Sequence, residues 1–315
     1  MKTIEIIVPC FNEEECIHPF IESISEVMDA LDRDYDWSIV FVDDGSYDKT
    51  LKVVKTYISE DQRNAEKIKY ISLARNFGKE GAMYAGLEKS TADCVIVMDA
   101  DLQHPPKLIP EMLEILENED YDCVGTRRVS RLGEPFVKSV LSRWFYHVIN
   151  WITGMGLVPG MTDYRAMKRK VVNAIVSMSE RERFTKGIYS WIGFRTKWIE
   201  YENVERSHGV SKWSIKSLMS YAGSGFIAFA TTPLRGVVYL GMIVVLMSFV
   251  YGIKLYIQVK SGGRIWYDTT TIILLLLFIG GVIITILGLV GEYIARIYME
   301  VKGRPIYIER ETNIK

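Results

Sequence analysis

The feature that most constrains this chain is a pair of long uncharged segments in its C-terminal third. Residues 236–253 and 269–291 contain no Asp, Glu, Lys or Arg, and the second holds the run ILLLLFIGGVIITILGLVG. A helix needs about 20 mainly apolar residues to cross a bilayer. The polar connector, residues 254–268, contains Ser-Gly-Gly and is typical of a turn. We therefore expect a hairpin of two transmembrane helices, at about residues 236–257 and 269–291; buried helices of a soluble protein are the alternative.

The preceding part of the chain, up to about residue 206, mixes charged and apolar residues as a soluble domain does. Runs rich in β-branched and aromatic residues predict strands, and stretches with apolar residues three and four apart predict helices. The strands are expected at residues 4–11, 37–44, 68–74 and 93–101, and the helices at 17–31 and 51–58. This alternation predicts an α/β fold whose mainly parallel, Rossmann-like sheet is flanked by helices.

Composition divides the chain into parts with different surroundings. We expect a catalytic domain over residues 1–213, an interfacial amphipathic helix over 214–232, a membrane domain over 233–298 and a C-terminal tail over 299–315. The interfacial helix is predicted from apolar residues at helical spacing, preceded by Lys212 and Trp213. A helix that packs within a soluble domain is the alternative interpretation of this pattern.

Charge and cysteine content narrow the partners and the compartment. The 38 Lys and Arg residues balance 39 Asp and Glu residues, so the composition does not indicate a nucleic-acid partner. The N-terminal sequence MKTIEIIVPCF resembles no signal peptide, and we expect the catalytic domain to be cytoplasmic. The four cysteines have no metal-binding spacing, which is typical of buried thiols in a reducing compartment.

An acidic pair follows one of the predicted strands. Asp99, Ala100 and Asp101 come directly after the apolar run that ends at Met98, and Gln103 adds another oxygen ligand. Divalent cations such as Mg²⁺ or Mn²⁺ prefer oxygen ligands, and two carboxylates at a strand end can share an ion that also binds a diphosphate. Acidic pairs at turns often contact only solvent. The interpretation as a metal site is therefore strengthened by the acidic residues at another predicted strand end.

A second acidic strand end is the sequence VDDGSYDKT. Asp43 and Asp44 can accept hydrogen bonds from a base and a ribose, and the Gly-Ser step turns the chain. The alternative is a strand, a turn and a capped helix, since Ser46 or Asp48 can cap a helix that begins near Thr50. The two interpretations are compatible, because turns often carry functional residues.

Basic residues of the kind that bind phosphate groups accompany these motifs. Arginine offers a planar fork for phosphate oxygens and lysine a compact charge. Arg127 follows a predicted strand, and Arg206 and Lys212 precede the membrane segments. The sequence contains no phosphate-binding loop of the form GxxxxGK[ST] and no GxSxG nucleophile motif, which argues against the nucleotide hydrolases and serine hydrolases that use them.

Five motifs, in this order, carry a resemblance to a known family: VPCFNEEE, VDDGSYDKT, RNFGKEGAMYAGL, DADLQHPP and ERSHGVSKW. The sequence resembles the polyprenyl-phosphate branch of the inverting family 2 glycosyltransferases, the branch of dolichol-phosphate mannose synthase. The two C-terminal spans make the bacterial bactoprenol (undecaprenyl-phosphate) glucosyltransferases the nearer match. The resemblance covers almost the entire chain.

The resemblance implies a GT-A catalytic domain with assigned residues. Nucleotide-sugar contacts are implied for Pro9, Glu13, Asp43, Asp44, Asp99, Ala100 and Arg127, metal ligation for Asp99, Asp101 and Gln103, and contacts to lipid phosphate or diphosphate for Arg143, Arg206, Ser211 and Lys212. Asp163 stands where a base is proposed in related enzymes, and Asp101 is the other implied catalytic residue. Phe11 replaces the tyrosine of many relatives, so a hydroxyl contact is lost there.

The implied reaction transfers glucose from UDP-glucose to undecaprenyl phosphate, with Mg²⁺ or Mn²⁺ as cofactor and with inversion at the anomeric carbon. The implied location is the inner or plasma membrane, crossed more than once, and the glycines of the second span allow a homo-oligomer such as a tetramer. A processive polysaccharide synthase is an alternative, although its QxxRW motif is absent. A catalytically silent membrane scaffold is another, although the acidic strand ends are present.

Overall fold

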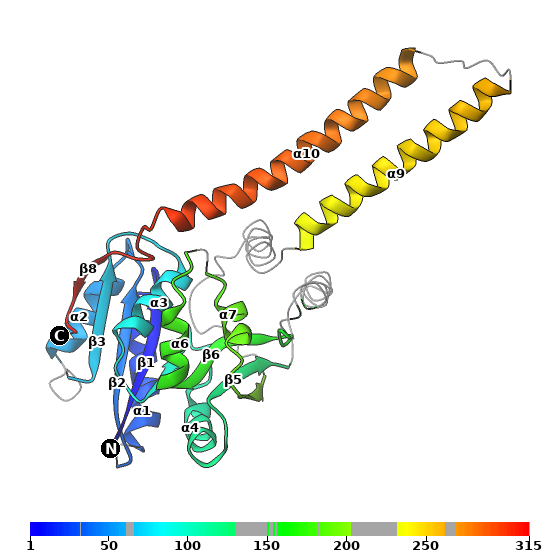
Figure 1. Ribbon diagram of the computed structural model, residues 1–315. Helices are drawn as coiled ribbons and strands as arrows, with labels where there is room; N and C mark the ends of the chain where they lie inside the picture. The colour runs from blue at the N-terminus through cyan, green and yellow to red at the C-terminus, as the bar shows by residue number, and fades with distance from the viewer. Residues whose placement is uncertain are drawn as a thin grey trace. The chain divides into compact units, whose positions relative to one another are not determined.

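The computed structural model describes residues 1–31, 33–60, 66–129, 150, 154, 156–181, 183–202, 232–261 and 269–314 (Figure 1). The chain divides into two compact units, one of Met1–Gly225 with Pro305–Lys315 and the other of Phe226–Arg304. The expected interfacial helix, residues 214–232, lies outside the described residues except for Thr232, where a helix of the second unit begins.

The first unit is built around a mixed sheet with the strand order β7-β5-β6-β4-β1-β2-β3-β8. Strands β6 and β8 run antiparallel to their neighbours and the other pairs are parallel. The strands are β1 (Lys2–Cys10), β2 (Tyr35–Asp43), β3 (Ile68–Leu73), β4 (Cys94–Val97), β5 (Cys123–Arg128), β6 (Met161–Lys168), β7 (Thr196–Tyr201) and β8 (Glu309–Thr312). The predicted mainly parallel α/β sheet is confirmed.

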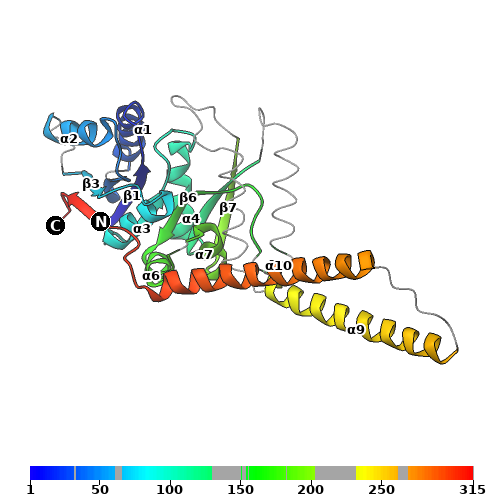
Figure 2. The same cartoon turned by 90° about the horizontal axis from the view of Figure 1, so that it is seen from above.

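Helices cover both faces of this sheet (Figure 2). They are α1 (Ile17–Asp29), α2 (Thr50–Glu60), α3 (Lys79–Lys89), the short helix η1 (Pro106–Leu108), α4 (Ile109–Asn118), α6 (Arg169–Ser177) and α7 (Thr185–Trp191). The apolar residues of α1 and α4 join alternate residues of β1 and β2 in one core. On the opposite face α3 packs so closely that a Cβ atom on Gly86 would overlap the side chain of Ile7.

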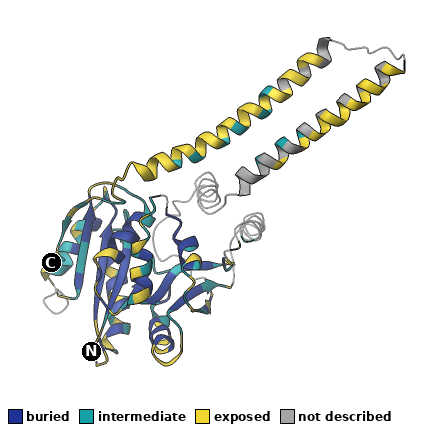
Figure 3. Ribbon diagram, in the orientation of Figure 1, coloured by how far each residue is buried: buried dark blue, intermediate teal, exposed yellow. Residues whose placement is uncertain are grey.

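Burial explains why these segments form strands. Ile4, Ile6, Ile7 and Val8 of β1 are all at most 1% exposed, so both faces of this central strand are covered. A strand buried on both faces has a nearly continuous apolar sequence, as expected in parallel sheets. Figure 3 shows the buried residues concentrated in the strands and in the helix faces turned toward them.

The chain re-enters this unit after the second one and adds the edge strand β8. Ile71 pairs with Thr312 and Ser72 with Glu311 in an antiparallel ladder. The sequence predicted only a tail over residues 299–315; Glu-Arg-Glu-Thr has no apolar alternation that would indicate a strand. The strand is fastened by polar contacts instead: Lys55 Nζ donates to Glu311 Oε2 at 2.7 Å.

The second unit contains two long helices. Helix α9 (Thr232–Lys260) has 29 residues and helix α10 (Thr269–Val301) has 33. At 1.5 Å per residue α10 is about 50 Å long, more than the roughly 30 Å of a bilayer's hydrocarbon core. Within the described parts of the chain, one segment is long and apolar enough to cross a membrane, Phe278–Val301, with a mean hydropathy of 2.0.

The loop between β2 and α2 depends on one glycine. Gly45 has a φ of +69°, and a Cβ atom on it would lie 2.6 Å from the carbonyl carbon of Arg75. Such close approach to backbone cannot be relieved by a side-chain rotation. The loop that carries Asp43 and Asp44 therefore packs directly against the segment that follows β3.

We expect Gly45→Ala to lower the free energy of unfolding by about 3 kcal/mol, since left-handed backbone costs roughly 1–2 kcal/mol and overpacking typically adds 1–3. Gly193→Ala is the matched control: Gly193 also has a φ of +69°, but its nearest neighbour, the Trp191 carbonyl oxygen, would lie 4.0 Å from the added Cβ. Denaturant unfolding of the full chain in detergent measures both. Equal losses would show that the contact with Arg75 is unimportant.

Candidate active site

Acidic side chains from neighbouring strands lie on the side of the sheet where the parallel strands β2 and β4 end. Asp43 ends β2, which pairs with β1, and β1 pairs in turn with β4. Val97 of β4 pairs with Arg165 of the antiparallel strand β6. Continued by two residues beyond the end of β4, this register would bring Asp99 opposite Asp163. The structure thus brings together residues that the sequence placed in separate motifs.

A lysine lies between these two carboxylates. Lys79 Nζ is 2.7 Å from Asp99 Oδ1 and 2.8 Å from Asp163 Oδ2. Burial alone would lower the pKa of the Lys79 ammonium, but Asp163 and Asp99 raise it well above its ordinary value. Burial would likewise raise the pKa values of both carboxyls, yet Lys79 brings them below their usual range. All three groups are therefore charged at neutral pH.

Lys79 belongs to the RNFGKEGAMYAGL motif, but the sequence predicted no role for it. Its place is set by Gly78, whose φ of 90° turns the chain into the first residue of α3. One signal could have pointed to Lys79: it directly follows a glycine, at the start of a helix that comes after a polar strand end. The distance along the chain to Asp163, 84 residues, hides the contact from any local pattern.

The predicted metal ligands share one turn after β4. Asp101 Oδ1 accepts a hydrogen bond from the Gln103 backbone N–H at 3.2 Å, and Leu102 between them has a φ of 56°. Within the described ranges no three His, Cys, Asp or Glu side chains converge as a preformed metal site. The donor set of Asp99, Asp101 and Gln103 nevertheless fits a hard divalent cation, since all are oxygen ligands and Asp99 already attracts an ammonium.

A buried histidine is hydrogen-bonded to the backbone of this turn. His104 is 1% exposed, and its Nδ1 accepts the Asp99 backbone N–H at 3.1 Å. Its ring stacks on Tyr164 with centroids 5.1 Å apart. Burial lowers the pKa of His104 despite the opposing charge of Asp99, so the ring is neutral and its Nδ1 is available as an acceptor. Sequence reasoning missed this residue, because one histidine after an acidic motif is not distinctive.

The carboxylates at the end of β2 are both buried and hydrogen-bonded. Asp43 accepts the Ser46 backbone N–H at 3.0 Å and the Ser72 hydroxyl at 3.1 Å. Asp44 accepts the backbone N–H groups of Phe77 at 2.6 Å and Gly78 at 2.9 Å. These contacts show that the loop also has the structural role considered in the sequence analysis.

The capping interpretation of the same loop is confirmed for one of its two candidates. Asp48 Oδ1 accepts the backbone N–H of Thr50, the first residue of α2, at 2.9 Å. Thr50 Oγ1 in turn accepts the backbone N–H of Glu13 at 2.8 Å. Pro9 lies in β1 one residue before its end. Pro9 and Glu13 therefore adjoin the Asp43–Asp44 loop, and their contact with a nucleoside stays a prediction.

Two adjacent arginines end β5 and have different partners. Arg127 forms an ion pair with Glu200. Arg128 donates from Nε to the Tyr201 hydroxyl at 3.0 Å, and its Nη2 lies 3.5 Å from Gln103 Oε1. The sequence singled out Arg127, whereas Arg128 reaches the acidic turn. The remaining candidates lie outside the described residues: Arg143, Arg206, Ser211 and Lys212.

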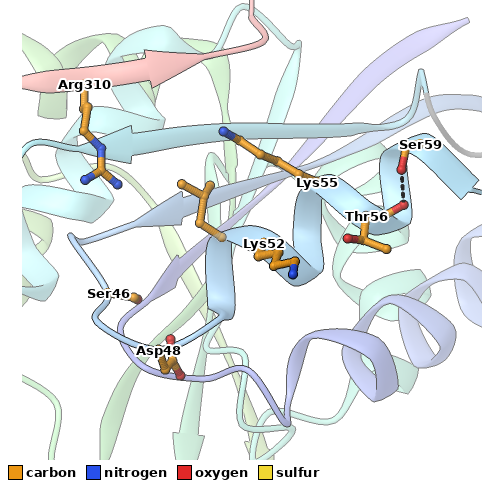
Figure 4. A pocket seen from close by; sticks show the side chains of 8 residues that line it. Ser46, Asp48, Lys52, Lys55, Thr56, Ser59 and Arg310 are labelled. Atoms are coloured by element: carbon orange, nitrogen blue, oxygen red, sulfur yellow. Dashed lines mark hydrogen bonds between the residues drawn. The ribbon is translucent and has the colours of Figure 1, made fainter.

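A surface hollow of about 430 Å³ lies beside the acidic loop (Figure 4). Ser46 and Asp48 of the β2–α2 loop line it together with Lys52 and Lys55 of α2 and Arg310 of β8. Asp99, Asp101 and Asp163 are not among its lining residues. The hollow is thus a feature distinct from the carboxylates around Lys79.

Comparison with known proteins identifies the class. The family model described as "Glycosyl transferase family 2" matches residues 5–176, and the one described as "GtrB C-terminal hairpin" matches residues 232–297. The chain belongs to glycosyl transferase family 2, and its helix-flanked, mainly parallel sheet is the GT-A fold that the sequence resemblance predicted.

Its relatives match it over almost the full length. CsbB of Bacillus subtilis (strain 168) is 43% identical over 311 residues, which is 99% of this chain and 92% of the relative. The SfII prophage-derived bactoprenol glucosyl transferase of Shigella flexneri is 37% identical over 310 residues, 98% of each chain. The prophage bactoprenol glucosyl transferase homolog of Escherichia coli (strain K12) is 36% identical over 305 residues, 97% of each chain.

We expect Lys79→Met to reduce glycosyl transfer about a hundredfold, as the loss of one electrostatic contact in an active site commonly does. Without the ammonium, Asp99 and Asp163 would face each other as like charges. Lys89→Met is the control, because Lys89 pairs with Glu309, at 3.0 Å, and touches neither aspartate. Initial rates with matched thermal unfolding separate activity from stability; unchanged transfer by Lys79→Met would refute the role.

Asp44 predicts a pH dependence of stability. Burial, reinforced by the charge of Asp43, raises its pKa to about 6 against the lowering effect of the Phe77 and Gly78 N–H groups. Between the ordinary value of 3.8 and about 6, the folded chain therefore holds a proton that the unfolded chain has lost. Stability from this group falls as pH rises through that window.

The measurement is the free energy of unfolding of the native chain minus that of Asp44→Asn, from pH 4 to pH 7 (about the range in which the carboxyl titrates). We expect this difference to decrease with rising pH and to level off above about pH 6. The opposite slope would mean that the two backbone N–H groups outweigh burial.

Proposed function

We propose that this protein transfers glucose from UDP-glucose to undecaprenyl phosphate, with inversion, at the cytoplasmic face of a bacterial inner or plasma membrane. The observation that supports this most strongly is its similarity, over 98% of each chain, to a bactoprenol glucosyl transferase. The carboxylates at the strand ends supply the chemistry that such a reaction needs. The two observations are independent, since one concerns the whole sequence and the other the geometry of a few side chains.

The donor side of the site is built from β1, β2 and the turn after β4. We assign Pro9, Glu13, Asp43 and Asp44 to the nucleoside, and Ala100 and Arg127 to the remainder of the nucleotide-sugar. Asp99, Asp101 and Gln103 would hold Mg²⁺ or Mn²⁺. When bound, such an ion neutralises charge on the departing diphosphate.

The acceptor side centres on Asp163 and Lys79. A phosphate monoester has a second pKa near 6 and is largely ionised at pH 7, so its oxygen needs little deprotonation. The lowered pKa of Asp163 makes this carboxylate a weak base, despite the opposing effect of burial. Asp163 therefore orients Lys79, whose positive charge attracts the incoming phosphate. We assign Arg143, Arg206, Ser211 and Lys212 to the lipid phosphate and the diphosphate.

The proposed bond changes form an in-line displacement. A phosphate oxygen of the lipid attacks the anomeric carbon of glucose and forms the new carbon–oxygen bond. The bond to the nucleoside diphosphate breaks, and its electron pair leaves with the diphosphate oxygen. Because attack comes from the opposite face, the configuration inverts. The fixed charges around Asp99 and Lys79 need little rearrangement as charge moves, which lowers the barrier.

We propose that the membrane portion crosses the bilayer twice and holds the catalytic domain, residues 1–213, at the headgroups. The 29 and 33 residues of α9 and α10 and the match of residues 232–297 to a hairpin family support this arrangement. Residues 214–232 would lie along the interface, 233–298 within the membrane and 299–315 on the cytoplasmic side. A homo-oligomer, such as a tetramer, would use the glycines of α10 for close helix contact.

The test is sugar transfer in membranes that contain the full chain, radiolabelled UDP-glucose and undecaprenyl phosphate. We expect a chloroform-soluble glucosyl lipid, its loss on addition of EDTA, and recovery with Mn²⁺ or Mg²⁺. Changing both Asp99 and Asp101 to Asn should reduce the rate at least about a thousandfold. Asp120→Asn is the control, since Asp120 pairs with Arg195 on the surface and its side chain is 89% exposed.

The same assay ranks the two proposed catalytic aspartates. Asp163→Asn should lose less activity than Asp101→Asn, because Asp163 mainly orients Lys79. Equal losses in two well-folded variants would contradict the ranking. A high-mass polymer as product would favour a processive synthase, and full activity without the Asp99–Asp101 pair would overturn the mechanism.

A further inference from the structure

The edge strand β8 brings a cation to the loop of Asp43. Antiparallel pairing with β3 sets Glu311 opposite Ser72. The next residue back along β8, Arg310, donates from Nη2 to the Ser72 hydroxyl oxygen at 3.1 Å. Figure 4 shows Arg310 entering from β8 while Lys52 and Lys55 come from α2.

Ser72 connects this arginine to Asp43. A serine hydroxyl has one proton to donate and lone pairs that accept. The Ser72 hydroxyl gives its proton to Asp43 Oδ2 at 3.1 Å and accepts from Arg310. Ser72 is fully buried and Asp43 is 2% exposed, so the hydroxyl and the carboxylate are shielded from water, whereas Arg310 is itself exposed. The two hydrogen bonds therefore form a path of fixed direction, from the Arg310 guanidinium through the Ser72 hydroxyl to the Asp43 carboxylate.

The other oxygen of Asp43 controls the loop. Asp43 Oδ1 accepts the backbone N–H of Ser46 at 3.0 Å. Ser46 Oγ accepts the backbone N–H of Asn12 at 2.9 Å, and Asn12 Oδ1 accepts the backbone N–H of Tyr47 at 2.8 Å. Asp43 is thus part of a set of hydrogen bonds that joins the loops after β1 and β2, a set that also includes the bond from Glu13 to Thr50. Hydrogen bonds to a charged group are about twice as strong as neutral ones, so a change in the orientation of Asp43 would weaken this set.

Independent contacts keep β8 in place. Glu311 accepts from Lys55 of α2, and Tyr307 donates its hydroxyl proton to Glu88 of α3 at 2.7 Å. Loss of the Arg310 side chain alone therefore leaves the strand attached. The effect of Arg310 on the loops can be separated from the presence of β8.

We propose that Arg310 is a positioning residue for donor binding: through Ser72 it fixes Asp43, and Asp43 fixes the loops that receive the nucleoside diphosphate. This inference rests on the proposed function, because it assigns the loops after β1 and β2 to the nucleotide. It adds that the strand following the hairpin unit is part of the donor site. The lipid acceptor and the carboxylates around Lys79 are outside the path.

The experiment measures UDP affinity in the presence of Mn²⁺, by calorimetry on the full chain in nanodiscs. Arg310→Met should weaken UDP binding about tenfold, the effect of leaving one buried hydrogen-bonded group unsatisfied. Ser72→Ala should weaken it similarly, and the double variant no further, because both changes interrupt one path. Arg310→Lys should restore part of the affinity. In transfer assays the KM for UDP-glucose should rise while kcat changes little.

Glu309→Gln is the matched control, since it removes a charge from β8 and the pairing with Lys89 without touching Ser72. It should bind UDP as the native chain does. Native UDP affinity in Arg310→Met, an equal loss in Glu309→Gln, or independent losses that multiply in the double variant would each overturn the proposal. Absence of UDP binding by the native chain would instead refute the proposed function, and this inference with it.

Discussion

The arrangement of the candidate site depends on one ammonium group between two carboxylates. Asp99, just after β4, and Asp163 of β6 come close together because the two strands pair antiparallel, and as like charges they would repel. Lys79 lies within 2.8 Å of both and turns that repulsion into attraction. The contact therefore ties the start of α3 to two strands of the sheet and fixes the positions from which a reaction would be carried out.

The position of Lys79 has its own support. Asp44 at the end of β2 accepts the N–H groups of Phe77 and Gly78, the two residues before the lysine. Gly45 allows this approach, because any larger residue would collide with the backbone near Arg75. A carboxylate in one strand-end loop thus aims a cation at Asp99 in the turn after β4 and at Asp163 within β6. Acidic residues here serve the fold and the site together, and neither role excludes the other.

The sequence predicted the central strands and α1 well, because their apolar runs and spacings are local properties. Contacts between residues that are far apart in the chain were harder to predict. Lys79 meets Asp163 across 84 residues. Which of Arg127 and Arg128 faces the acidic turn depends on the strand's exact register, and an irregularity between Gly125 and Arg127 removes the simple alternation. Strand β8 has no apolar pattern at all, since polar contacts and ladder bonds hold it at the edge.

The order of the chain gives β8 a consequence for biosynthesis. Its four residues come after α10, so the ribosome makes them only when the whole hairpin has been produced. Until then β3 is an open edge, with unpaired backbone groups that can recruit strands from other molecules. The interval between synthesis of β3 and synthesis of β8 is therefore the stage at which the newly made protein is most prone to association. The short polar strand β8 then pairs with β3 and covers its exposed edge.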